Sequence, residues 1–112
     1  QYILEEAYFY GRTFYVDPSV LIPRTETELL IELVVAEFSH QKNVRILDVG
    51  TGSGCIAITL AKEMTQAEIF AVDISEQALM TAKKNADQLQ ATVYFDQLDF
   101  LQEKISQKKL TT

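Results

Sequence analysis

The stretch from Arg45 to Gly54 (RILDVGTGSG) constrains this chain more than any other part of the sequence. Its first half is apolar and predicts a short strand, and its second half places three glycines at alternate positions. Glycines carry no Cβ atom, so a ligand can lie against bare backbone there. A helix predicted from Cys55 to about Lys62 would point its first unpaired N–H groups at that ligand. The stretch therefore predicts a strand, a ligand-binding turn and a helix, in that order.

The residues around this turn predict an α/β fold. The run Val44–Val49 is almost continuously apolar, so we expect a strand buried on both faces. Further strands are expected at Glu68–Val72 and Thr92–Phe95, separated by a helix of about Glu76–Leu89 with Ser75 as its N-cap. Alternating strands and helices predict a right-handed parallel sheet.

The residues before the turn have a different character. Tyr2 to Val16 carry aromatic runs on both sides of Gly11, which predicts a β-hairpin. We expect this hairpin to be structural rather than catalytic; the alternative is that its aromatic residues help to form a substrate wall. A helix from about Glu26 to Phe38 follows, and the spacing of Thr25 and Glu28 predicts a capping box. The apolar stripe of this helix is expected to contain Leu30, Leu33, Val34 and Phe38.

Composition limits the partners that the chain can have. Its 112 residues are enough for one domain, and an apolar fraction of 47% supports a core. A net charge of -6 disfavours direct contact with nucleic acid, which calls for a basic face. No apolar run is long enough to cross a membrane, so no membrane contact is expected. The single cysteine, Cys55, leaves no disulfide framework or zinc cluster and predicts a cytoplasmic setting.

Two ligand classes compete for the glycine turn. The dinucleotide fingerprint is G-x-G-x-x-G and places a pyrophosphate at the helix N-terminus. Here the glycines are Gly50, Gly52 and Gly54, and Cys55 stands where the third dinucleotide glycine would be. Asp48 precedes the turn, and its charge suits an ammonium or sulfonium group better than a pyrophosphate. These features favour S-adenosylmethionine, which carries both cationic groups.

Acidic residues follow the next two predicted strands. Asp73 could accept hydrogen bonds from ribose hydroxyls, or it could cap the helix that follows Ser75. Asp99 could accept a hydrogen bond from the exocyclic amine of adenine, with Phe100 packed on the face of the purine. Alternatively, Asp99 is a solvated loop carboxylate, or Asp96 takes this role in its place. These positions lie at the carboxyl ends of neighbouring strands, where open α/β sheets bind ligands.

With these motifs the chain resembles the HemK/PrmC family, methyltransferases that modify the glutamine side-chain amide of peptide chain release factors. The matching segments are Phe9–Gly11 (FYG), Val20–Glu28 (VLIPRTETE), Ile46–Gly54 (ILDVGTGSG) and Ala71–Ser75 (AVDIS). Thr25 departs from the proline that usually follows the arginine in that family. The resemblance implies an α/β, Rossmann-like class I methyltransferase fold, truncated after its first three parallel strands.

This resemblance also implies a domain division and a site. Residues 1–40 would form the hairpin, linker and leading helix, and residues 41–112 the N-terminal half of the cofactor-binding domain. Pro23 and Arg24 would lie on the substrate side, with release factors as protein substrate; a purely structural turn at Pro23 and Arg24 is the alternative. The residues expected to bind S-adenosylmethionine are Asp48, Gly50, Thr51, Gly52, Ser53, Gly54, Asp73, Ile74, Asp99 and Phe100.

The catalytic residues of the family are not among those expected here. Its Asn-Pro-Pro-Tyr motif would orient the weakly nucleophilic amide toward the methyl group. That motif does not occur in the sequence, and we expect it beyond Thr112 in a longer protein. The fragment alone is therefore expected to be inactive.

Other interpretations stay open at the level of the sequence. An amino-methyltransferase acting on nucleic-acid bases would share the Asn-Pro-Pro-Tyr type of motif. A non-catalytic nucleotide- or cofactor-binding module, or a structural remnant, would need no such motif. Cys55 is expected to be a small buried helix residue, and Glu26 and Glu28 capping and solvated acids rather than general bases.

Overall fold

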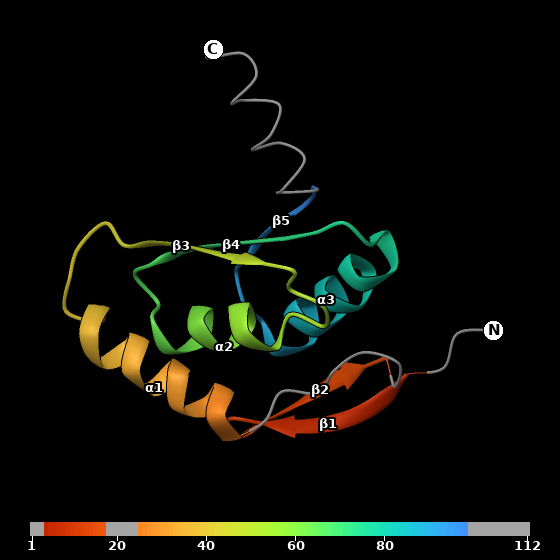
Figure 1. Ribbon diagram of the computed structural model, residues 1–112, viewed down its shortest axis with the longest axis horizontal. Helices are drawn as coiled ribbons and strands as arrows, with labels where there is room; N and C mark the ends of the chain where they lie inside the picture. The colour runs from red at the N-terminus through yellow and green to blue at the C-terminus, as the bar shows by residue number, and fades with distance from the viewer. Residues whose placement is uncertain (1–3, 18–24, 99–112) are drawn as a thin grey trace, which may run out of the picture.

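The computed structural model describes residues 4–17 and 25–98 of the chain, in two sheets and three helices (Figure 1). Pro23, Arg24, Asp99 and Phe100 lie outside the described residues. The order of elements confirms the order that the sequence predicts. The elements are β1 (Glu5–Phe9), β2 (Arg12–Val16), α1 (Thr25–Phe38), β3 (Arg45–Val49), α2 (Cys55–Glu63), β4 (Glu68–Asp73), α3 (Glu76–Leu89) and β5 (Tyr94–Gln97).

The central sheet is parallel, with its strands in the order β3-β4-β5. Both connections, through α2 and through α3, therefore step in the same direction across the sheet. Since such crossovers are right-handed, both helices fall on one face. Figure 1 shows all three helices on the same side of the sheet, with the hairpin beyond them. The predicted parallel α/β arrangement is confirmed.

The prediction that β3 is buried on both faces is wrong. Leu47 is 46% exposed and Val49 is 52% exposed, whereas Ile46 and Asp48 on the helix side are half-buried. The physical reason is the topology, because two crossovers on one face leave the other face of the sheet open within the described part of the chain. Phe70 and Tyr94 continue this open face, with ring centroids 5.2 Å apart.

The predicted apolar stripe of α1 is also largely wrong. The buried residue is Ile31, with 1% exposure, and Val34 packs partly buried against the core as expected. Leu30 and Leu33 are 52% and 60% exposed, and Phe38 also belongs to the exposed residues. The helix carries apolar residues on more than one face, so periodicity alone could not select the face that packs.

The hairpin turn consists of Tyr10 and Gly11, whose φ angles of 51° and 78° are both positive. Positive φ angles at both central residues are what the type I′ hairpin turn requires. Phe9 and Phe14 beside the turn meet edge to face, with centroids 6.2 Å apart, and both are buried. The hairpin and the parallel sheet thus share one apolar core. The division between residues 1–40 and 41–112 stays a prediction.

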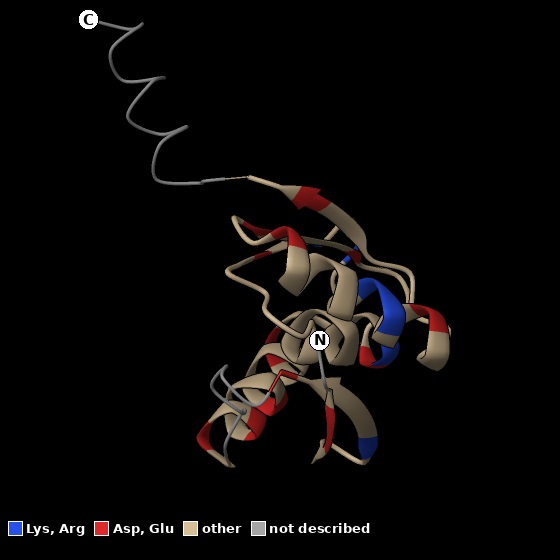
Figure 2. Cartoon of the chain, turned by 90° about the vertical axis from the view of Figure 1, so that its right-hand side faces the viewer, with Lys and Arg blue, Asp and Glu red and all other residues tan. Residues whose placement is uncertain are grey.

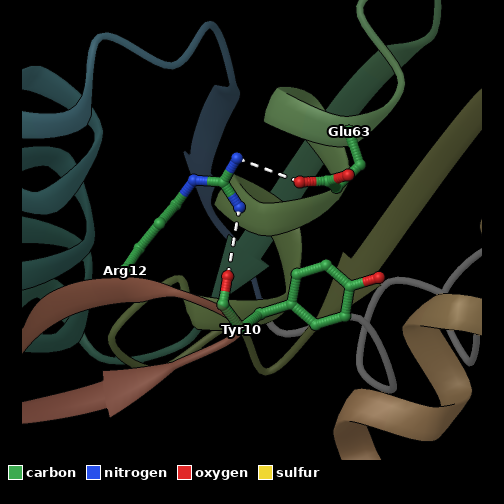
Figure 3. Close-up of polar contacts among 3 residues, drawn as sticks. All are labelled: Tyr10, Arg12 and Glu63. Carbon is green, nitrogen blue, oxygen red and sulfur yellow. Dashed lines mark hydrogen bonds and ion pairs between the residues drawn. The ribbon is translucent and has the colours of Figure 1, made fainter.

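Polar contacts hold the hairpin turn against the helices. The Arg12 guanidinium pairs with Glu63 at the end of α2, at 3.0 Å, and a second nitrogen donates to the Tyr10 carbonyl at 3.4 Å (Figure 3). On the other side, a Glu28 carboxylate oxygen accepts the Tyr10 amide at 2.7 Å. The helix α1 begins at Thr25, one residue before the predicted Glu26. The sequence predicts that Glu28 caps the N-terminus of this helix. The contact found instead joins α1 to the hairpin.

Acidic residues are spread over the molecule and outnumber the basic ones, in keeping with the net charge of -6 (Figure 2). Within residues 4–17 and 25–98, no helix has the length and apolar character needed to span a bilayer.

Candidate functional site

The glycine turn joins β3 to α2 at the carboxyl end of the sheet. The amides of Gly50 and Thr51 both donate to the Val72 carbonyl, at 2.9 and 3.0 Å. The next amide, of Gly52, donates to the Asp73 carboxylate at 2.9 Å. Successive N–H groups of the turn are therefore attached to the end of β4, which fixes the shape of the turn relative to the neighbouring strand.

The three glycines of the turn have positive φ angles, of 74° at Gly50, 58° at Gly52 and 84° at Gly54. Side chains rarely adopt this region, so each position favours glycine. A Cβ added at Gly54 would lie 2.9 Å from the Ile58 side chain and 3.1 Å from Ala82, whereas one at Gly50 would meet nothing within 4 Å. Gly54 thus allows α2 and α3 to pack closely, while Gly50 leaves bare backbone that a ligand could approach.

Asp48 lies at the end of β3, half-buried on the helix side of the sheet. Its Oδ2 accepts a hydrogen bond from the Thr51 hydroxyl at 2.8 Å. Burial raises the pKa of Asp48, and the nearby Asp73 carboxylate raises it further, against the lowering effect of the Thr51 and Ala57 hydrogen bonds. A desolvated carboxylate close to a second one gains from a cation, because the cation offsets both the lost hydration and the mutual repulsion.

Asp73 ends β4 with both carboxylate oxygens in use. Oδ2 accepts from Gly52, and Oδ1 accepts the Ser75 amide at 2.9 Å. The N-cap of α3 is Ser75, as predicted, since its hydroxyl accepts the Ala78 amide at 3.1 Å. A carboxylate has about four acceptor positions, so Asp73 retains capacity for further donors such as hydroxyl groups.

The end of β5 is attached to the loop that follows β4. The Leu98 amide donates to the Asp73 carbonyl at 3.1 Å, and the Gln97 side chain donates to the Ile74 carbonyl at 3.0 Å. The Ile74 side chain is exposed. Asp96 pairs in register with Val72 and faces the open side of the sheet, so the structure does not bring its side chain together with Asp48 and Asp73.

Cys55 is buried at the first position of α2, which confirms the expectation of a small buried helix residue. Burial raises the pKa of the Cys55 thiol to about 11, so it stays protonated near neutral pH. Its sulfur lies 3.1 Å from the Ser53 hydroxyl. A protonated, buried thiol is a poor nucleophile.

The sequence interpretation missed Asn85, on α3. Its side-chain nitrogen donates to the carbonyl of Ser53 in the glycine turn at 2.8 Å, and the residue is 1% exposed. The sequence does contain a clue to this role. Asn85 lies three positions after Ala82 and next to Ala86, so a polar amide interrupts the predicted apolar stripe of the helix. Buried amides need specific partners, so such a position points to a structural contact.

The chemistry of these residues suits noncovalent binding of a cationic ligand that also carries hydroxyl groups. The site combines bare backbone at Gly50, a desolvated Asp48 and an Asp73 with spare acceptor capacity. Among residues 4–17 and 25–98, no three His, Cys, Asp or Glu side chains are grouped so as to hold a metal ion.

Comparison with known proteins agrees with this arrangement. The family model described as "Methyltransferase domain" matches residues 40–111. The release factor glutamine methyltransferase of Flavobacterium psychrophilum is 50% identical over 105 residues, covering 91% of this chain and 37% of the relative. That of Koribacter versatilis is 54% identical over 101 residues, covering 90% of this chain and 36% of the relative. These names confirm the resemblance drawn from the sequence.

The chain spans little more than a third of the length of these relatives, as their coverage of 37% and 36% shows. Among solved structures, the Pyrococcus abyssi tRNA (uracil-54, C5)-methyltransferase in complex with S-adenosyl-L-homocysteine shares the fold, with a TM-score of 0.66 and 19% identity. It aligns with 86% of this chain and 23% of its own. The family match, the parallel sheet and the glycine turn lead to one conclusion: the chain belongs to the methyltransferase domain family.

Proposed function

We propose that this chain is the cofactor-binding part of a release factor glutamine methyltransferase that uses S-adenosylmethionine. The whole enzyme would transfer a methyl group to the side-chain amide nitrogen of a glutamine in a peptide chain release factor. The names of the relatives support the substrate class. The observation that carries the cofactor assignment is the open backbone at Gly50 beside the desolvated carboxylate of Asp48.

The described residues fit S-adenosylmethionine by their chemistry. The cofactor, when bound, supplies an electrophilic methyl group on its sulfonium. The turn from Gly50 to Gly54 would lie against its methionine portion, with Asp48 close enough to favour the cationic groups. Asp73 would accept the ribose hydroxyls through its remaining acceptor positions, and the exposed Ile74 would contact the nucleoside.

The remaining roles stay predictions for residues outside the described part of the chain. Asp99 and Phe100 would flank the adenine, and Pro23 and Arg24 would lie on the substrate side. Because the sequence contains no Asn-Pro-Pro-Tyr motif, we expect no methyl transfer by the 112 residues alone. We also expect a cytoplasmic protein without direct nucleic-acid contacts.

Calorimetry with S-adenosylhomocysteine and with NAD tests the cofactor assignment. We expect the unaltered chain to bind S-adenosylhomocysteine, and Gly50→Val to abolish that binding because a branched side chain would fill the open side of the turn. Asp96→Asn is the matched control, since it lies on the open face of the sheet and should bind normally. Tight NAD binding without S-adenosylhomocysteine binding would overturn the assignment.

The substrate assignment is tested with the longer protein that contains this chain. Incubation with radiolabelled S-adenosylmethionine should label a purified release factor and leave transfer RNA and DNA unlabelled. Replacement of the acceptor glutamine in the release factor by alanine should abolish the label. Label in a nucleic acid instead would favour the amino-methyltransferase alternative.

A further inference from the structure

The buried side chain of Asn85 connects three segments that are far apart in sequence. Its Oδ1 accepts the Tyr15 amide at 2.7 Å, and its Nδ2 donates to the carbonyls of Tyr15 and Ser53, both at 2.8 Å. Both amide hydrogens and one oxygen position are therefore used, and every partner is a main-chain group. Asn85 is 1% exposed, so water could not replace these hydrogen bonds if they were broken.

On the hairpin side, Asn85 occupies the free edge of β2. A two-residue turn pairs Phe9 with Arg12, and alternation along the ladder then directs the N–H and C=O of Tyr15 away from β1. The Asn85 carboxamide satisfies both groups at once, as a neighbouring strand would. Asn85 therefore attaches the outer edge of β2 to α3, in addition to the apolar contacts of the buried Phe14 and Val16.

On the other side, Asn85 holds the glycine turn. The Ser53 carbonyl lies between Gly52, whose amide is held by Asp73, and Gly54, which packs tightly on Ala82. Ala82 and Asn85 are three residues apart and thus lie on the same face of α3. The helix supports the turn at two successive points, one by packing and one by a hydrogen bond.

A neighbouring residue provides a comparison. The Lys84 ammonium lies over the Tyr15 ring, 4.5 Å from its centroid. Lys84 thus contacts the same hairpin residue as Asn85. In the described part of the chain, Lys84 makes no hydrogen bond or ion pair with the glycine turn. Substitution of Lys84 therefore weakens the attachment of the hairpin without removing a support of the turn.

We propose that Asn85 is a positioning residue that couples the glycine turn to the β-hairpin. A ligand that orders the turn also orders the Ser53 carbonyl, and through Asn85 the outer edge of β2. The proposal rests on the proposed function in taking that ligand to be S-adenosylmethionine or its product. The hairpin leads in sequence toward Pro23 and Arg24, so the coupling would let cofactor binding act on the substrate side.

Amide hydrogen exchange measured by NMR tests the coupling. The probes are Gly54, whose amide donates to the Thr51 carbonyl within the turn, and Phe14, which lies opposite Ala7 in the hairpin ladder. In the unaltered chain, saturation with S-adenosylhomocysteine should slow exchange at both amides. In Asn85→Ala it should slow exchange at Gly54 alone, and affinity should fall roughly tenfold because the turn has lost a buried hydrogen bond.

Lys84→Gln is the matched control, and should retain both the affinity and the joint protection of Gly54 and Phe14. Equal protection of Phe14 in the unaltered chain and in Asn85→Ala would overturn the coupling. If Asn85→Ala does not fold, the unaltered chain still decides, because protection of Gly54 without Phe14 contradicts the proposal. If S-adenosylhomocysteine does not bind, the proposed function fails instead, and ligand-free exchange in Asn85→Ala decides whether Gly54 depends on Asn85.

Discussion

At the scale of single residues, the three glycines of the turn serve different purposes although the sequence presents them as one motif. Gly54 is required by the close approach of α3, and Gly50 has open space on the side where a Cβ would lie. Gly11 in the hairpin also has a positive φ and open space. Substitutions at these three glycines can therefore distinguish the effects of backbone strain, packing and ligand access.

Alanine at these glycines should therefore have three outcomes. Gly11→Ala should cost about 1–2 kcal/mol of unfolding free energy, from the left-handed backbone alone. Gly54→Ala should cost about 1–3 kcal/mol more, because the added methyl group also crowds Ala82. Gly50→Ala should resemble Gly11→Ala in stability and still weaken S-adenosylhomocysteine binding. Urea unfolding and calorimetry measure the two effects, and equal losses at Gly11 and Gly54 would contradict the packing argument.

Asp48 gives a second prediction at this scale. Because its pKa is raised in the folded chain, the protonated form is favoured there, and its ionisation costs stability as pH rises through the folded pKa. Asp48→Asn should thus be at least as stable as the unaltered chain at pH 7 in urea unfolding, and should lose that advantage below the ordinary pKa of a free aspartate.

Binding should show the opposite preference. A cationic ligand favours ionised Asp48, so the affinity for S-adenosylmethionine should fall as pH drops toward the raised pKa. At pH 7, Asp48→Asn should weaken binding roughly 10- to 100-fold, as for loss of a charged hydrogen bond. Asp96→Asn removes the same charge on the open face and should change neither stability nor affinity. Unchanged affinity in Asp48→Asn would remove Asp48 from the site.

At the scale of elements, the hairpin is held by contacts of unequal strength. The Arg12–Glu63 pair is partly exposed, with side-chain exposures of 23% and 32%, so solvent screens it. The Glu28 carboxylate accepts a main-chain amide in a partly buried place, where an unmade bond is more costly.

Urea unfolding should reveal this difference. Glu28→Ala should cost about 1.5–3 kcal/mol, because it leaves the Tyr10 amide without its charged acceptor. Glu63→Gln should cost no more than about 1 kcal/mol, and its effect should shrink in 1 M salt. Glu28→Gln keeps an acceptor oxygen and should fall between the two. A larger loss for Glu63→Gln than for Glu28→Ala would reverse the ranking.

The face of α1 shows why an element can be predicted while its packing is not. Start, end and type followed from the cap region and the apolar content, and the structure agrees within one residue. The buried position is Ile31 rather than Leu30 or Leu33, because apolar residues occur on several sides of the helix. The side of α1 that packs is determined by its neighbours, α2 and the hairpin. The sequence of the helix alone does not show where these neighbours lie.

At the scale of the whole molecule, local patterns predicted the hairpin, the alternation of strands and helices and the parallel sheet. They also placed Asp48, the glycines and Asp73 at one edge, since carboxyl ends of parallel strands meet there. The bond from Gly52 to Asp73 and those from Asn85 to Tyr15 and Ser53 were not predictable. They join residues 21 to 70 positions apart, and no local periodicity encodes such pairs.

The open face of β3 escaped prediction for a related reason. An apolar run such as that from Ile46 to Val49 looks the same whether one or two layers cover it. The deciding fact is the strand order β3-β4-β5, which sends both crossovers to the same side.

The attachment of the turn to β4 makes the site depend on the length of a strand. Val72 presents its carbonyl to the turn, and Asp73 its carboxylate, only because β4 pairs with β3 in one register. Deleting a single residue between Glu68 and Val72 would turn alternate side chains to the other face and carry Asp73 to the open side. We therefore expect insertions and deletions within β4 to disrupt the site more completely than single substitutions do.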